Sequence, residues 1–117
     1  MRPHFLFLFL FLSSPLYAML GVMDGVQLKE NLDLREQMMK QQAIRDDEML
    51  IRATGASSYI WGAAEMGNKT YFCFPAKWVI SDVVEVVHRF LKANPQRLNE
   101  PAALLVRAGL AKKFPCL

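Results

Sequence analysis

The sequence is poor in the residues that build metal sites, with two cysteines and two histidines among 117 residues. A Cys/His cage would need all four, and no close pair such as C-x-x-C or H-x-x-x-H occurs. Charge of one sign is also scarce, because 14 Lys and Arg stand against 11 Asp and Glu. A net charge of +3 is too small and scattered for a nucleic-acid-binding surface. We therefore expect no metal, no other cofactor and no nucleic-acid partner.

The one long apolar run lies at the start of the chain. Residues 1–18 have a basic beginning at Arg2, an apolar run over residues 5–12 and small residues leading to Ala18. This is the layout of a secretory signal peptide. A membrane anchor would need about 20 apolar residues, and this run is far shorter. We expect residues 19–117 to be exported as a single domain that does not associate with the membrane after cleavage.

The two cysteines of the exported part, Cys73 and Cys116, can pair in only one way. Export would place them in an oxidising compartment, where a bridge would stabilise the fold by about 4 kcal/mol. The alternative is a small hydrolase in which one cysteine is the nucleophile and His88 the base. Exported unpaired thiols are unusual, so we interpret the cysteines as structural. We expect no catalytic residue, and His88 to be a surface or boundary residue.

Apolar spacing predicts four helices and no pair of strands. The expected helices cover about residues 28–42, 44–66, 82–94 and 101–114. The third is the clearest, since its apolar residues fall at i, i+3, i+4, i+7 and i+8: Val83, Val86, Val87, Phe90 and Leu91. Gly21 and Gly25 predict a loose segment before the first helix. Residues 70–75 are dense in aromatic side chains and predict a buried crossing loop. The expected fold is all-α, a small disulfide-stapled bundle of about four helices.

The second expected helix is rich in small residues: Gly55, Ala56, Gly62, Ala63 and Ala64. Such residues let another backbone approach closely. We therefore expect tight packing against residues 59–64, by another helix of the same chain or by a second copy. Leu50 or Ile51 shares a further face with Thr54, Ser58 and Trp61.

Short motifs follow one another in a characteristic order in the second half of the chain. They are Tyr59-Ile60-Trp61-Gly62, Phe72-Cys73-Phe74-Pro75, Phe90-Leu91-Lys92-Ala93-Asn94-Pro95, Pro101-Ala102-Ala103 and Phe114-Pro115-Cys116. With this ordered set, residues 57–116 resemble the Rap/Tai family of type VI secretion immunity proteins. The resemblance implies a periplasmic, mostly helical protein, commonly a homodimer, that blocks a peptidoglycan-cleaving amidase injected by neighbouring bacteria.

The resemblance also bears on the cysteines. The family pairs its cysteines, and the matching positions here are Cys73 and Cys116. Many members carry a further cysteine just before the Tyr-x-x-Gly segment. This chain has Ala56, Ser57 and Ser58 there, so we expect no additional bridge.

An inhibitor of this kind would act by occlusion, inserting rigid groups into the cleft of the amidase. The segment 96–100, braced by Pro95 and Pro101, is the most protrusion-like part of the chain. We expect Arg97, Asn99 and Glu100 to contact the partner, although polar residues that connect helices are usually only solvated. A periplasmic envelope or chaperone-like protein on the same scaffold, without a toxin partner, is the alternative.

Overall fold

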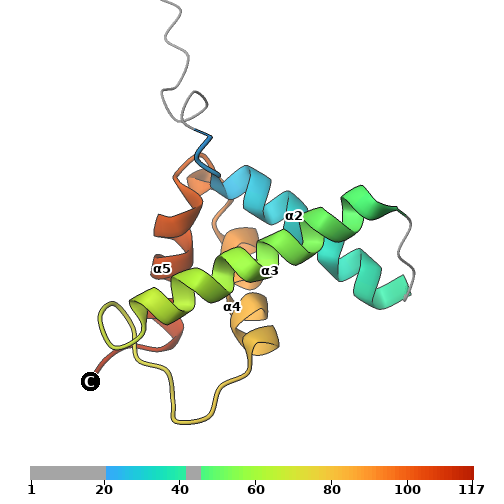
Figure 1. The fold of residues 1–117 in the computed structure, drawn as a ribbon. Helices are drawn as coiled ribbons and strands as arrows, with labels where there is room; N and C mark the ends of the chain where they lie inside the picture. The colour runs from blue at the N-terminus through green and yellow to red at the C-terminus, as the bar shows by residue number, and fades with distance from the viewer. Residues whose placement is uncertain (1–20, 42–45) are drawn as a thin grey trace, which may run out of the picture.

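The computed structural model describes residues 21–41 and 46–117. They form four α-helices and one short 3₁₀ helix: α2 (Gly25–Gln41), α3 (Asp47–Gly67), α4 (Ile80–Ala93), η1 (Pro95–Arg97) and α5 (Ala102–Lys113). In Figure 1, α3 runs as one long rod across the front of the other helices, crossing α2 near one end and reaching α5 near the other. No strand occurs in these ranges, so the predicted all-α bundle of about four helices is confirmed.

Three of the expectations from the sequence fall outside the described residues. They are the signal peptide of residues 1–18, the end of the first helix at position 42 and the start of the second helix at position 44. Within residues 21–41 and 46–117, no helix is both long enough and apolar enough to cross a membrane.

The first helix begins at Gly25 rather than at residue 28. Its start is held by a distant segment, because the amides of Gly25 and Val26 donate to the carbonyls of Glu100 and Leu98, each at 3.0 Å. A Cβ at position 25 would lie 2.8 Å from the Leu98 carbonyl oxygen, so the close approach requires glycine. The expected looseness of this glycine is therefore wrong, because contacts distant in sequence fix it.

The second helix, α3, begins at Asp47 in the described residues. The Asp46 side chain accepts a hydrogen bond from the Met49 amide at 2.8 Å, which caps the helix. Asp47 and Glu48 follow in the first turn, near the positive end of the helix dipole. Its inward face consists of small and branched residues: Ala53, Ala56, Ile60, Ala64 and Gly67. These let α3 lie close to the other three helices.

The small residues of α3 divide between two faces. Ala56 and Ala64 are fully buried within the chain, which confirms the expected tight packing. Gly55 and Gly62 lie on the opposite side, where an added Cβ would meet nothing within 4 Å. Trp61 belongs to this outer side and is 47% exposed. The described chain therefore covers only one of the two small-residue faces.

The third helix, α4, separates its apolar and polar sides as predicted. Three residues of the expected stripe are buried and two are half-buried at its edge: Val83, Val87 and Leu91, then Val86 and Phe90. His88 is buried too, with only 7% of its surface exposed. It is therefore not a surface residue, because α2 packs against this side of α4.

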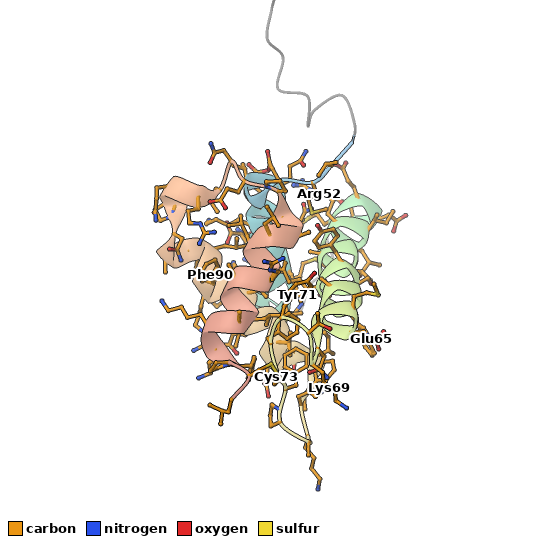
Figure 2. The ribbon with its side chains drawn as sticks, turned by 90° about the vertical axis from the view of Figure 1, so that its left-hand side faces the viewer. Arg52, Glu65, Lys69, Tyr71, Cys73 and Phe90 are labelled. Carbon is orange, nitrogen blue, oxygen red and sulfur yellow. A yellow bond between two sulfur atoms is a disulfide. The ribbon has the colours of Figure 1, made fainter. Side chains whose placement is uncertain are left out.

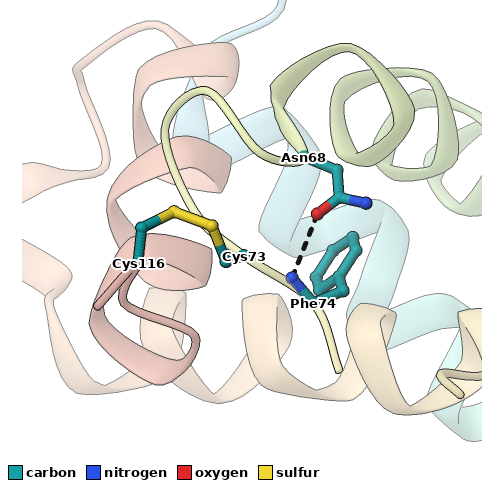
Figure 3. The surroundings of a disulfide bond; sticks show 4 residues. All are labelled: Asn68, Cys73, Phe74 and Cys116. Atoms are coloured by element: carbon teal, nitrogen blue, oxygen red, sulfur yellow. Dashed lines mark hydrogen bonds between the residues drawn. A yellow bond between two sulfur atoms is a disulfide. The ribbon is translucent and has the colours of Figure 1, made fainter. Parts of the chain in front are cut away.

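The expected disulfide is present between Cys73 and Cys116 (Figure 3). Next to it, the Cys73 amide donates to the Phe114 carbonyl at 2.8 Å. The Asn68 side-chain oxygen accepts from the Phe74 amide at 3.0 Å. The segment that follows α5 is thereby joined to the loop between α3 and α4.

The loop between α3 and α4 contains a cluster of aromatic rings, but the expectation that residues 70–75 are buried holds only in part, because Tyr71 is 51% exposed. Phe72 is buried, and the Phe74 ring lies 4.5 Å from Trp78 and 5.1 Å from Phe114 between centroids. The backbone turns closely around Phe72, since a Cβ at Gly67 would lie 2.5 Å from its ring. The disulfide therefore sits beside an apolar cluster that holds the same two segments together.

Candidate functional site

The three predicted contact residues lie on the connection between α4 and α5. Asn94 closes α4, since its side-chain amide donates to the Phe90 carbonyl at 2.8 Å. η1 follows, and the Glu100 amide then donates to the Arg97 carbonyl at 3.0 Å. Successive short turns thus replace a flexible loop between the two helices.

This connection is held from behind by the segment that precedes α2. Besides the bonds from Gly25 and Val26, the Ala102 amide donates to the Met23 carbonyl at 2.9 Å. Leu98 packs against the hydrophobic core. A surface fixed in this way loses little conformational entropy when it binds a partner.

Arg97 and Glu100 form a two-point ion pair at the surface. Arg97 Nε donates to one carboxylate oxygen of Glu100 at 2.7 Å, and Nη2 donates to the other at 3.0 Å. The bonds to Arg97 lower the pKa of Glu100, and the bonds to Glu100 raise the pKa of Arg97. The guanidinium also lies 5.7 Å from the Phe90 ring centroid. Asn99 is exposed and lies outside this pair.

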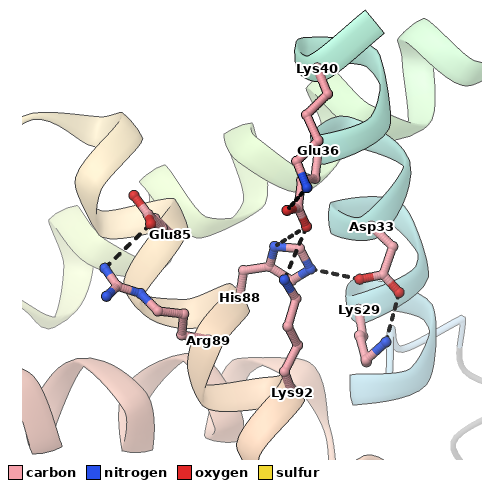
Figure 4. Close-up of polar contacts among 8 residues, drawn as sticks. All are labelled: Lys29, Asp33, Glu36, Lys40, Glu85, His88, Arg89 and Lys92. Carbon is pink, nitrogen blue, oxygen red and sulfur yellow. Dashed lines mark hydrogen bonds and ion pairs between the residues drawn. The ribbon is translucent and has the colours of Figure 1, made fainter.

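A second polar cluster joins α2 to α4 (Figure 4). His88 Nε2 lies 2.7 Å from Asp33 Oδ1, and Nδ1 lies 3.8 Å from Glu36 Oε2. Lys92 and Lys40 reach Glu36 at 3.0 and 2.8 Å. Lys29 pairs with Asp33 at 2.7 Å. We call these residues the α2–α4 polar cluster.

The α2–α4 polar cluster keeps its carboxylates ionised. Hydrogen bonds from Lys40 and Lys92 lower the pKa of Glu36 to about 2. Burial alone would raise the pKa of Asp33, but hydrogen bonds with Lys29 and His88 outweigh burial and lower it. Ionised, mutually paired groups of this kind hold two helices together.

The hydrolase alternative loses its nucleophile in this structure. Cys73 and Cys116 are bonded to each other, so neither offers a thiolate to His88. His88 faces Asp33 and Glu36 instead. Across residues 21–41 and 46–117, no group of three or more His, Cys, Asp or Glu side chains has the geometry to hold a metal ion.

Sequence reasoning did not predict Asp33 and Glu36. A signal was present, because they are three residues apart on one expected helix, while His88 and Lys92 are four apart on another. A charged face on each of two helices is compatible with contact between those helices. The sequence does not show which helices pack together, whereas the structure shows that α2 packs against α4.

Together these observations define a class of protein: a small helical domain with a disulfide bond and a rigid polar turn between two helices. The sequence model of one family, the Rap1a immunity proteins, matches residues 24–116. The chain therefore belongs to the family of Rap1a immunity proteins, whose members generally act as inhibitors and not as enzymes. No curated protein matches the chain.

Proposed function

We propose that this protein works in the periplasm, where it binds a type VI secreted peptidoglycan amidase and occludes its active site. In this proposal residues 1–18 are a signal peptide removed on export, and residues 19–117 form the mature domain. Family membership supports binding to a toxin. The rigid turn that carries Arg97, Asn99 and Glu100 supports occlusion as the mechanism.

The fixed geometry of this turn is the observation on which the mechanism rests. A guanidinium has five N–H donors, and Arg97 uses one on Nε and one on Nη2 for Glu100. Its remaining donors are available for carbonyl or carboxylate oxygens in a cleft. Asn99 is exposed next to it and adds one acceptor and two donors. In the proposed complex these groups contact the amidase cleft and exclude peptidoglycan without any chemical step.

The proposal is tested by co-expressing the exported protein with type VI amidases in a bacterial host, and by assaying peptidoglycan cleavage with purified proteins. We expect one amidase to bind and lose activity. Replacing Arg97, Asn99 and Glu100 together by alanine should weaken binding by about 30-fold or more, as for central contact residues. The matched control replaces another surface Arg–Glu pair, Arg52 and Glu30, whose charged atoms are 4.0 Å apart, and should leave inhibition unchanged.

Two results would contradict this proposal in different ways. Unchanged inhibition by the triple variant would show that the turn is not the contact surface. Binding of many unfolded proteins and of no amidase would favour the envelope or chaperone-like alternative.

We also propose that the protein is a homodimer, and that the outer face of α3 forms the contact. This face carries Trp61 and Ile51, the latter 70% exposed, next to Gly55 and Gly62. Residues 53–64 include no charged side chain. Exposed apolar residues beside small ones allow two helices to approach closely, as in helical dimers.

Analytical ultracentrifugation tests the dimer. Gly62→Glu would place two like charges near each other at the contact, so we expect a monomer with an unchanged helical circular dichroism spectrum. Gln37→Glu adds the same charge to an exposed position on α2 and should leave the dimer intact. A dimer that persists in Gly62→Glu would show that another face forms it.

A further inference from the structure

We propose that a groove between α4 and α5 docks an acidic segment of a protein partner through one inserted apolar side chain. The groove has a volume of about 340 Å³ and is open rather than enclosed. Val86, Phe90 and Gly109 line it from below, and Arg89, Lys112 and Lys113 lie around it. This groove is an interaction surface in addition to the turn that we propose occludes the amidase. The inference does not require the partner to be an amidase.

The apolar floor exists because α4 and α5 approach each other closely at Gly109. A Cβ at this position would lie 2.9 Å from Cγ of Phe90, so glycine allows the ring to rest on α5. Phe90 and Val86 are only half-buried, although both lie on the apolar side of α4. Figure 2 labels Phe90 on the side of the molecule where α4 and α5 are neighbours. Apolar surface is therefore accessible at the bottom of a concave site.

The charged residues that line the groove are all positive: Arg89, Lys112 and Lys113. Lys112 and Lys113 are exposed in the last turn of α5, and neither pairs with a carboxylate in the described residues. Arg89 lies 3.5 Å from Glu85, but both side chains are well exposed and such a pair is weak. These cations outweigh the partial charge of about −0.5 at the C-terminal end of each neighbouring helix.

Charge complementarity therefore selects an acidic occupant, and the floor selects an apolar side chain within it. A concave site of this size accepts one or two side chains and leaves the flanking carboxylates near the lysines. A membrane surface is flat and fits the concave floor less well. Nucleic acid would meet a patch of three cations, which is small for a backbone-binding surface. An acidic protein segment is the occupant that uses both the floor and the rim.

The proposal is tested by NMR on the ¹⁵N-labelled exported protein, with a capped pentapeptide probe that has leucine between two pairs of acidic residues. We expect chemical-shift changes confined to residues 86–94 and 109–113, with a dissociation constant on the order of 1 mM. The matching peptide with glycine in place of leucine, and one with lysines in place of the acids, should bind at least about fivefold more weakly.

Lys113→Glu should weaken binding of the acidic pentapeptide by about 5- to 10-fold, because it replaces charge attraction by charge repulsion at the rim of the groove. Lys77→Glu, at an exposed lysine in the loop before α4, should leave binding unchanged. Ala93→Glu, also in the lining, should reduce binding without affecting the fold. No shifts in the groove at about 10 mM peptide would overturn the proposal. Binding of anionic lipid vesicles without a response to the peptide would also overturn it, in favour of a lipid surface.

Discussion

Glu36 lies between Lys40 and Lys92, and this position governs its acid–base behaviour. Its folded-state pKa of about 2 is below the ordinary value of 4.5, because both lysines donate hydrogen bonds to the ionised form. A lowered pKa means that the ionised carboxylate stabilises the fold above about pH 4.5. That contribution is lost as the pH falls through about 2.

Glu36→Gln should therefore lower the melting temperature at pH 7, and the difference from the unmodified protein should shrink as the pH approaches 2. Thermal unfolding followed by circular dichroism between pH 2 and pH 7 measures this. Glu65→Gln, at an exposed position of α3, removes the same charge and is the matched control. A Glu36→Gln effect that does not vary with pH would contradict this explanation.

Tyr59 supports the start of another helix, because its phenol oxygen bonds to the backbone of Ala103 in the first turn of α5. α5 has no side-chain cap of its own, so this tyrosine satisfies one of its free amides. Burial dominates over this bond and raises the pKa of Tyr59.

Tyr59→Phe should lower the free energy of unfolding by about 0.5–1.5 kcal/mol, the net contribution of one such hydrogen bond. Urea denaturation measures the change. The control is Tyr71→Phe, since Tyr71 is exposed and keeps its ring contact with the Arg107 guanidinium, 4.2 Å away. Equal effects of the two substitutions would show that the bond to α5 is not the cause.

At the scale of helices, two glycines in similar helical positions have opposite surroundings. Gly109 faces the Phe90 ring across the contact between α4 and α5, whereas Gly55 faces open space. Alanine is favoured over glycine in helices by about 1 kcal/mol. At Gly109 this gain is opposed by overpacking, which destabilises by about 1–3 kcal/mol.

Gly109→Ala should therefore destabilise the protein, and Gly55→Ala should stabilise it by about 0.5–1 kcal/mol. Denaturant unfolding of both variants gives the two changes, at a protein concentration low enough to keep the protein monomeric, because Gly55 lies in the proposed dimer contact. Stabilisation by Gly109→Ala would mean that the Phe90 ring can move aside without a loss of packing energy.

The helices were predictable from the sequence to different degrees, for physical reasons. The apolar stripe of α4 is a local pattern, so it was predicted correctly. The start of α2 was missed because its first amides bond to residues 98 and 100. His88 was misplaced for the same kind of reason, since its burial depends on α2. The spacing of apolar residues along one helix does not reveal such long-range contacts.

At the scale of the whole molecule, the disulfide closes a large part of the chain. Cys73 and Cys116 are separated by 43 positions, and the bridge joins the segment after α5 to the aromatic loop. This pairing could be predicted, because the sequence contains no third cysteine. The contact role of Arg97, Asn99 and Glu100 stays a prediction, since surface polarity does not reveal a partner.

Replacing both cysteines by serine should lower the free energy of unfolding by about 2–4 kcal/mol. Denaturant unfolding with and without dithiothreitol measures it. The reductant should destabilise the unmodified protein to a similar extent and leave the Cys73→Ser, Cys116→Ser variant unaffected. No effect of the reductant on either protein would contradict a stabilising role for the bridge.

The bonds between residues 23–26 and residues 98–102 also determine when the molecule can finish folding. During synthesis the chain emerges from its N-terminal side, so α2 is made before the residues that anchor its start. Most of the stability of a helix in a folded protein comes from the packing of its apolar face against other elements. The start of α2 becomes fixed only after the turn before α5 has emerged. The contacts that complete this end of the bundle can therefore form only late in synthesis, because they join residues that are distant in sequence.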